Sequence, residues 1–208
     1  MRYNPLGDSG LMVSVVGVGC NAFGARIDED QTKAVVDAAI EQGITLFDTA
    51  DSYADGASEE LLGRALGTRR ESVLVATKFG MGDHDAEHFG AHGSRRYVRR
   101  AVEASLRRLG TDYIDLYQIH RLDPDTPMEE TMEALHDIVK AGKVRHIGAS
   151  SMYAWQFAKT QQIARERGWT PFVSMQNHYN LAYREEEREM IPLCRDQGVA
   201  LIPWSPLA

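Results

Sequence analysis

The sequence predicts an α/β fold of the (β/α)8 TIM-barrel class, with an N-terminal β-hairpin and without the last C-terminal βα unit. Short apolar runs alternate with amphipathic helices at the spacing of βα units, which predicts a parallel sheet. Polar residues follow strand after strand, as at the active rim of a barrel. A doubly wound dinucleotide fold would carry Gly-x-Gly-x-x-Gly after its first strand, but Gly17 and Gly19 are next followed by Gly24.

Composition indicates one globular domain. The 208 residues are 43% hydrophobic and 25% charged, so we expect residues 1–208 to form a single barrel domain that is incomplete at its C-terminus. No apolar run approaches the roughly 18 residues that cross a bilayer, and residues 1–5 do not resemble a signal peptide. We therefore expect a cytoplasmic protein without a membrane partner. A net charge of −7 argues against nucleic acid as a partner, because phosphate binding needs clustered Lys and Arg.

Cysteines and arginines indicate structural roles. Cys20 and Cys194 show no Cys-x-x-Cys spacing, so we expect reduced core thiols and neither a disulfide nor a thiolate zinc site. Paired arginines at residues 95–96, 99–100 and 107–108 recur at helical spacing and predict a solvated helix face. The oligomeric state is not predicted.

The first elements are a hairpin and one βα unit. Residues 2–6 and 11–16 flank a Gly-Asp-Ser-Gly turn and predict the two strands of the hairpin. The apolar run at 15–19 predicts the first barrel strand. A helix is expected over residues 29–42, because Gly43 follows it as a stop signal.

Two similar units follow. Residues 44–47 predict a strand, and a helix is expected from Ser58 to Gly67. Residues 73–77 predict the next strand, which leads into a long loop rich in Gly and His. The helix after this loop keeps its apolar period up to Gly110.

The fourth unit begins with a strand at residues 113–119. Thr126 and Glu129 form a capping-box pattern, with a proline at the first helical position between them. Gly142 marks the end of this helix.

With the last units, the chain still has fewer predicted strands and helices than a closed barrel. A strand at residues 144–148 is followed by a helix, and a strand at 172–175 by an acidic helix at 184–197, which Pro192 should kink or divide. The final strand is expected at 199–203. The count is seven strands and six following helices, whereas the closed fold has eight of each in about 250 residues. We therefore expect the natural polypeptide to continue, or this form to be truncated.

The residues just after these strands form a polar series. The series is Asp48, Lys78, His120, Ser150 with Ser151, Gln176 with Asn177, and Trp204 with Ser205. A single Asp, Lys or His at a strand end is more often part of a loop ion pair than a catalytic group. Recurrence at successive strand ends favours one shared active site, because a parallel barrel gathers these ends at one rim.

Four residues at this rim predict proton chemistry. Lys78 at the mouth of a barrel needs a counter-charge to keep its proton, and Asp48 on the neighbouring strand can supply it. A lysine ammonium beside the Tyr53 phenol would favour the phenolate and prepare Tyr53 to exchange a proton near neutral pH. His120 can donate a ring N–H to a substrate oxygen. Together they could polarise a carbonyl group and protonate the resulting alkoxide.

Several stretches combine into a specific pattern. They are the hairpin, Phe47-Asp48-Thr49-Ala50-Asp51-Ser52-Tyr53 with Ser58-Glu59, Thr77-Lys78, Asp115-Leu116-Tyr117-Gln118-Ile119-His120, Ile147-Gly148-Ala149-Ser150-Ser151, Gln176-Asn177-His178-Tyr179-Asn180, and Trp204-Ser205-Pro206-Leu207. Over nearly the whole chain, this pattern resembles the aldo-keto reductase family. The resemblance implies NAD(P)H-dependent reduction of aldehydes or ketones, with a small carbonyl compound as substrate.

The resemblance also implies residue roles. Tyr53 would be the general acid or base, Lys78 and Asp48 the pair that tunes it, and His120 the group that orients the carbonyl. The implied cofactor contacts are Ser150, Ser151 and Gln176 on the nicotinamide carboxamide, Trp204 stacked on that ring, Ser205 on the pyrophosphate and Asp48 at the ribose. Many family members carry asparagine in place of Ser151, where a hydroxyl can still hydrogen-bond. NADP is expected before NAD, although the segment that binds the 2′-phosphate in the family is absent from this sequence.

Three other hypotheses stay open. Lys78 could form the Schiff base of a barrel lyase, although Asp48 would hold its proton in place. The same fold could serve as a cofactor-sensing regulatory subunit with little turnover. His84, His88 and His92 are spaced four apart, as metal ligands on a helix would be, but the glycines around them favour a substrate-side loop and no metal site.

Overall fold

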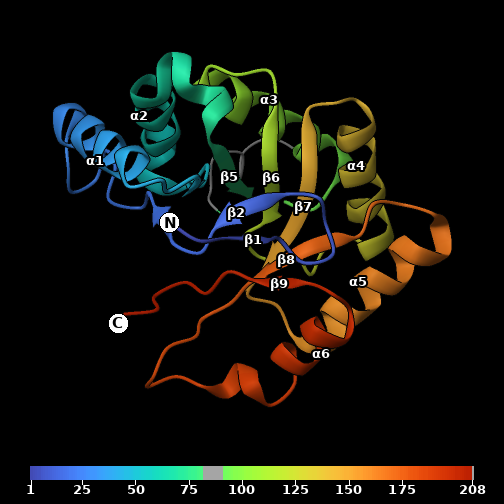
Figure 1. Ribbon diagram of the computed structural model, residues 1–208. Coiled ribbons are helices and arrows are strands. Elements are labelled where there is room, and N and C mark those ends of the chain that lie inside the picture. The colour runs from blue at the N-terminus through green and yellow to red at the C-terminus, as the bar shows by residue number, and fades with distance from the viewer. Residues whose placement is uncertain (82–90, 208) are drawn as a thin grey trace.

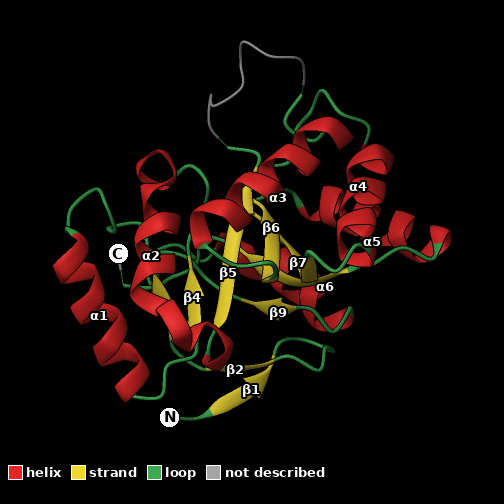
Figure 2. Ribbon diagram, turned by 90° about the horizontal axis from the view of Figure 1, so that it is seen from above, coloured by secondary structure: helices red, strands yellow, loops and turns green. Residues whose placement is uncertain are grey.

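A computed structural model shows a curled parallel sheet with helices along its outer side (Figures 1 and 2). The structure describes residues 1–81 and 91–207. In sheet order the strands are β3 (Gly17–Gly19), β4 (Leu46–Asp48), β5 (Leu74–Phe79), β6 (Ile114–Ile119), β7 (Val144–Ser150), β8 (Phe172–Gln176) and β9 (Ala200–Leu201). Each strand pairs in parallel with the next one along the chain. The predicted barrel-class fold is confirmed for the described residues, which contain seven of its strands.

Helices separate the successive strands. They are α1 (Glu29–Glu41), α2 (Ala57–Leu66), α3 (Arg95–Leu109), α4 (Met128–Lys140), α5 (Ala154–Arg167) and α6 (Met190–Asp196), with the 3-10 helices η1 (Tyr53–Gly56), η2 (Gly67–Ser72) and η3 (Glu185–Glu187). Local signals set their ends. At the start of α1, the side chains of Asp28 and Gln31 each accept a hydrogen bond from the other's backbone N–H. Gly110, with φ of 64°, ends α3 in the left-handed conformation.

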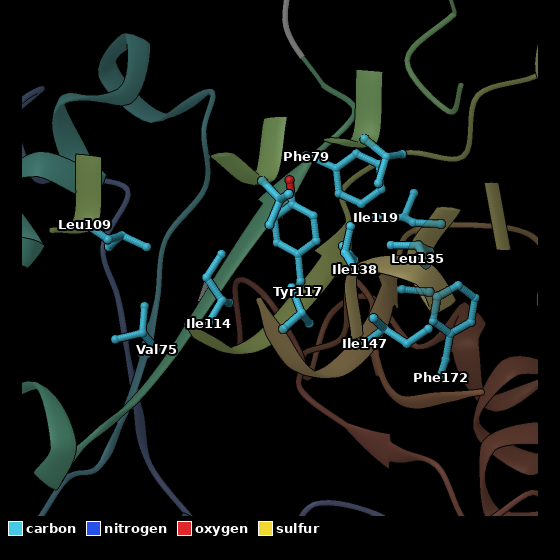
Figure 3. Close-up of a cluster of buried hydrophobic side chains, with 14 of the residues drawn as sticks. Val75, Phe79, Leu109, Ile114, Tyr117, Ile119, Leu135, Ile138, Ile147 and Phe172 are labelled. Atoms are coloured by element: carbon cyan, nitrogen blue, oxygen red, sulfur yellow. The ribbon is translucent and has the colours of Figure 1, made fainter. Parts of the chain in front are cut away.

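Successive side chains of each strand point to opposite faces of the sheet, so the sheet separates two apolar layers. One layer fills the space between the sheet and the helices (Figure 3). It includes Val75, Phe79, Ile114, Tyr117, Ile119, Ile147 and Phe172 from the strands, packed with Leu109, Leu135 and Ile138 from the helices. The other layer lies on the opposite face, where Leu46, Ala76 and Leu116 pack together inside the curl.

The N-terminal hairpin of β1 (Tyr3–Pro5) and β2 (Met12–Ser14) packs against the inner layer. Leu6 and Val13 are buried there. The hairpin turn touches the loop before β9, since the Asp8 N–H donates to the Gly198 carbonyl at 2.7 Å. A Cβ atom on Gly7 would lie 2.5 Å from the same carbonyl oxygen, so only glycine permits this approach. The hairpin therefore closes the interior at the end opposite to the predicted site.

Several strands extend further than the apolar runs predict. The sequence places Asp48, Lys78, Ser150 and Gln176 just after their strands, but the structure makes them the last or next-to-last residues of β4, β5, β7 and β8. The backbone ladder continues past the apolar run because inward polar side chains can satisfy one another there.

One helix prediction is wrong, and a second is right about a division of the helix but not about its position. Thr126 forms no capping box, because its hydroxyl donates to Asp123 Oδ2 at 2.7 Å and Pro127 is the residue before α4. The helix expected at residues 184–197 is divided into η3 and α6. The division precedes Pro192, which lies in the first turn of α6, where its missing N–H has no helical partner to lose.

A buried carboxylate connects β5, β6 and β7 near their amino-terminal ends. Asp115 is 1% exposed, and its Oδ2 accepts hydrogen bonds from Arg70 Nη2 at 2.8 Å and from the Val75 N–H at 3.0 Å. Arg145 Nη1 donates to Oδ1 at 3.3 Å. Both guanidinium groups also lie against the Tyr113 ring, 4.2 Å and 3.8 Å from its centroid.

We expect Asp115→Ala to lower the free energy of unfolding by about 3 kcal/mol or more, because the Arg70 guanidinium and the Val75 N–H lose their partner. Urea denaturation measures this change. Asp137→Ala is the matched control, since its ion pair with Arg99 is exposed and such pairs contribute about 1 kcal/mol or less. Equal small losses in the two variants would contradict the buried role of Asp115.

Candidate active site

Asp48 is the centre of a polar network at the carboxyl ends of the strands. Its Oδ2 accepts a hydrogen bond from Lys78 Nζ at 2.6 Å. Its Oδ1 accepts from Gln118 Nε2 at 2.9 Å and from Gln176 Nε2 at 3.0 Å. These side chains come from β4, β5, β6 and β8, so strands that are distant in sequence converge on one carboxylate.

Lys78 is fully buried, and its ammonium group has three oxygen neighbours. Nζ lies 2.6 Å from Asp48 Oδ2, 2.7 Å from the Thr49 carbonyl oxygen and 3.4 Å from the Tyr53 hydroxyl. Burial by itself lowers the pKa of Lys78, but the charge of Asp48 and then the Tyr53 oxygen raise it, so the net pKa lies above its ordinary value. Lys78 is therefore an ammonium ion at neutral pH.

Tyr53 reaches Lys78 because the chain turns sharply after it. Tyr53 begins η1, and the next three residues have positive φ: Ala54 at 48°, Asp55 at 53° and Gly56 at 88°. This conformation costs a residue other than glycine about 1–2 kcal/mol. Contacts from the surrounding structure must therefore hold the turn.

Arg108 and Glu59 supply such contacts from the outer side of the sheet. A Cβ atom on Gly56 would lie 2.6 Å from Arg108 Cδ, so glycine leaves room for this side chain. Arg108 Nε donates to Glu59 Oε2 at 2.6 Å, and the Thr77 hydroxyl donates to Glu59 Oε1 at 2.5 Å. Glu59 is fully buried. Arg108 thus departs from the predicted solvated helix face, which the other arginines of α3 keep.

His120 lies beside Tyr53 and is 7% exposed. The two rings meet edge to face, with centroids 5.8 Å apart and planes at 83°. Ser52 Oγ lies 3.5 Å from His120 Nδ1. Burial, and then the positive charges of Lys78 and Arg121, lower the pKa of His120 to about 3. The imidazole is therefore neutral at physiological pH and carries one N–H that can donate to a ligand.

The other predicted residues lie beside this group. The Ser150 hydroxyl donates to the Gln176 carbonyl at 2.7 Å, and Trp204 Nε1 donates to Ser151 Oγ at 3.1 Å. Ser151 and Ser205 have positive φ values of 45° and 49°. Gln176 joins the two groups, because its side chain also donates to Asp48.

The structure therefore brings the predicted site residues into one region at the carboxyl ends of the strands. Asp48, Lys78 and Tyr53 are in direct contact, and His120 adjoins Tyr53. The catalytic and binding roles of all these residues stay predictions.

Two side chains of this region are missed by sequence reasoning. Gln118 pairs in register with Lys78 and precedes His120 by two residues, so the period of a strand could have placed it inside. Asn180 belongs to a quoted motif but has no predicted role, and its Nδ2 donates to the Ser205 carbonyl at 3.0 Å. A local sequence pattern gives no sign of that contact, because 25 residues separate the two.

Other predictions concern metals and cysteines. Residues 1–81 and 91–207 contain no group of three or more His, Cys, Asp or Glu side chains arranged for a metal ion. His84 and His88 lie outside the described residues, whereas the His92 ring lies against Tyr97 with centroids 4.8 Å apart. Cys20 and Cys194 are buried, as predicted for core thiols. None of the helices in the described part of the chain is long and apolar enough to cross a membrane.

Asp51 is a buried acid behind the Tyr53 turn. Its side chain is 5% exposed, and its Oδ1 has no hydrogen-bond partner among the described residues. Burial, and then the negative charge of Glu59, raise the pKa of Asp51 to about 7, although Arg108 opposes the shift. Burial and the same two carboxylates raise the pKa of the nearby Tyr117 phenol.

Comparisons with known proteins agree on one family. The model of the aldo/keto reductase family matches residues 15–208. A versiconal hemiacetal acetate reductase from Aspergillus parasiticus is 48% identical, over 100% of this chain and 68% of its own length. An aldo-keto reductase from Alternaria alternata is 46% identical (99% and 65%), and a putative aryl-alcohol dehydrogenase from Schizosaccharomyces pombe is 44% identical (99% and 67%). The chain spans about two thirds of the length of the curated relatives it matches.

The pKa of Asp51 predicts a pH-dependent stability. Because the pKa rises from 3.8 in the unfolded chain to about 7 in the folded one, the native state binds the proton more tightly between these values. The contribution of Asp51 to stability therefore falls as pH rises through this window, by up to about 1.4 kcal/mol per pH unit. We expect Asp51→Asn to gain stability relative to the parent protein over the same window.

Urea denaturation across this pH range measures the difference between variant and parent. The difference is needed because His120, whose folded pKa is lowered, gains stability as pH rises and partly offsets Asp51 in the parent. Asp55→Asn is the matched control, as Asp55 is exposed in the same turn. A difference that stays constant with pH would refute the shifted pKa.

Proposed function

The chain belongs to the aldo/keto reductase family, and on this premise we propose that it reduces aldehydes or ketones to alcohols with NADPH, with NADH as the second choice of cofactor. The observation that carries the proposal is the buried Lys78 ammonium, which lies between the Asp48 carboxylate and the Tyr53 hydroxyl. The names of two relatives, a hemiacetal acetate reductase and an aryl-alcohol dehydrogenase, support a carbonyl and alcohol pair as substrate and product.

Proton transfer is the part of the reaction that this chain's own side chains perform. When bound, the nicotinamide cofactor would supply the hydride that the carbonyl carbon accepts. Tyr53 donates its hydroxyl proton to the carbonyl oxygen as negative charge builds there. Lys78, at 3.4 Å, stabilises the phenolate that remains, and Asp48 keeps Lys78 charged. Neutral His120 orients the carbonyl oxygen with its N–H.

The predicted residues beside the Asp48 network have side chains that suit a nicotinamide cofactor. Gln176 donates through Nε2 to Asp48, which fixes the amide and leaves its carbonyl oxygen for a carboxamide N–H. The Ser150 and Ser151 hydroxyl oxygens lie 3.4 Å apart, with Ser150 bonded to the Gln176 backbone, and can complete that contact. Trp204 is 37% exposed, so part of its ring is open to stacking. Ser205 is proposed for the pyrophosphate and Asp48 for the ribose.

The charge on Lys78 argues against a Schiff-base lyase. An amine nucleophile must lose its proton, and the raised pKa of Lys78 opposes that step. We expect sodium borohydride to trap no covalent adduct between the protein and a carbonyl substrate in the absence of cofactor, as judged by intact mass. An added mass that disappears in Lys78→Met would instead support the lyase.

We expect Tyr53→Phe to lower kcat by about 10²–10⁴-fold, because the proton donor is lost. NADPH binding, followed by fluorescence, should be unchanged, since the phenol oxygen acts on the substrate. Steady-state reduction of a panel of aldehydes and ketones measures the first effect.

Tyr179→Phe is the control for this experiment. Tyr179 also carries a hydrogen-bonded hydroxyl, but it bonds to Glu187 on the exposed surface. Full activity in Tyr53→Phe would refute the proposed role. A parent protein that binds NADPH tightly and reduces no carbonyl compound would favour the regulatory-subunit hypothesis.

A further inference from the structure

We propose that His178 is a positioning residue that, with Tyr183 and Asn180, fixes the plane of the Trp204 indole for stacking on the nicotinamide ring. This inference rests on the proposed function, because it deepens the cofactor site described there. It assigns a role to the middle of the segment Gln176–Asn180, in which sequence reasoning gives a cofactor role only to Gln176.

Three rings form one continuous stack. The centroids of His178 and Trp204 are 4.1 Å apart with planes at 11°, and those of His178 and Tyr183 are 4.4 Å apart with planes at 17°. The imidazole therefore contacts an aromatic ring on each of two sides. One face of the indole is covered by the imidazole, and Trp204 as a whole is 37% exposed, which leaves the opposite face of the ring outside this stack. That face is the one available to a ligand ring.

Asn180 locks the imidazole within the stack. Its Oδ1 accepts hydrogen bonds from the Ala182 and Tyr183 N–H groups at 2.9 Å and 2.8 Å, which fixes the orientation of the amide. Its Nδ2 then faces His178 Nε2 at 3.2 Å. The same Nδ2 donates to the Ser205 carbonyl at 3.0 Å. One amide thereby connects the imidazole, the Tyr183 backbone and the residue after Trp204.

The indole is also held at its backbone and at its nitrogen. The Trp204 N–H donates to the Asn177 carbonyl at 3.0 Å, and this contact is part of a parallel bridge between His178 and Trp204. Trp204 Nε1 donates to Ser151 Oγ at 3.1 Å. These bonds fix the backbone of Trp204 and one atom of its indole, but a hydrogen bond through Nε1 still permits rocking of the ring plane. The imidazole face removes that freedom.

A ring held in one plane binds a second ring with less loss of conformational freedom, which is the benefit of preorganisation. Without His178, Trp204 would move among orientations of which only some accept the nicotinamide ring. The expected consequence is weaker binding of the nicotinamide half of the cofactor and a faster local motion of the indole.

The first test follows the motion of Trp204 without any cofactor. Trp155→Phe and Trp169→Phe together leave Trp204 as the only tryptophan of the three. In this background, time-resolved fluorescence anisotropy should show no subnanosecond rotation of Trp204 in the parent, and a clear subnanosecond component in His178→Ala. His178→Phe should largely restore the parent behaviour, because a phenyl ring keeps the stacking contacts with Trp204 and Tyr183 although it loses the contact with Asn180. His136→Ala is the matched control, since His136 is another half-buried, hydrogen-bonded histidine far from the stack in sequence.

The second test measures the affinity for NADPH in the same four proteins by fluorescence titration. We expect Kd to rise about twofold to tenfold in His178→Ala, and to stay within twofold of the parent in His178→Phe and His136→Ala. Unchanged anisotropy or unchanged Kd in His178→Ala would overturn the inference, because the ring would then need no support. If the parent itself fails to bind NADPH, the proposed function fails and the inference falls with it. The anisotropy result still reports the stack, so the two failures are distinguishable.

Discussion

The burial of one ammonium ion constrains the whole site. A buried lysine is unfavourable unless a carboxylate and further acceptors surround it. Lys78 meets this requirement only when β5 is in register with β4, where Asp48 pairs with Ala76. A slip of one residue would turn Lys78 toward the helices, into the apolar layer that holds Val75 and Phe79. The ion pair therefore selects one strand register and places the Tyr53 hydroxyl beside the charge.

Strand β5 separates two charged groups of opposite character. Lys78 faces inward, where one ammonium and one carboxylate balance. Thr77 faces outward, where its hydroxyl bonds to Glu59 and Arg108 interacts with two carboxylates, Glu59 and Asp51. Burial, and then the negative charge of Glu59, explain why the pKa of Asp51 is raised to about 7. The turn that carries Tyr53 is thus fixed from both sides of the sheet.

Sequence reasoning predicts the barrel class, which the structure confirms, and a set of site residues that the structure places close together, because both depend on the periods of strands and helices. Alternating apolar runs reveal the strands, and polar residues at their ends reveal the rim. What it misses depends on contacts across the fold. The role of Gln118 depends on its hydrogen bond to Asp48, which lies 70 residues away in the sequence. Arg108 resembles a surface arginine in the sequence, but in the structure its guanidinium group bonds to Glu59. The failed capping box shows that a local signal can lose to a competing partner, because the Thr126 hydroxyl bonds to Asp123 instead of to the backbone of α4.

The backbone strain of the described residues is concentrated in the loops of the site. The non-glycine residues with positive φ are Ala54, Asp55, Ser151 and Ser205, and all of them follow a strand at its carboxyl end. Asparagine tolerates this conformation better than serine, because its short amide can hydrogen-bond locally. This explains why an asparagine is favourable at the position of Ser151. The serine is held there instead by its place directly after β7 and by the Trp204 Nε1–H bond to its hydroxyl. The same bond that compensates the strained serine thereby orients the indole, so the backbone of one loop and the ring of another are fixed together.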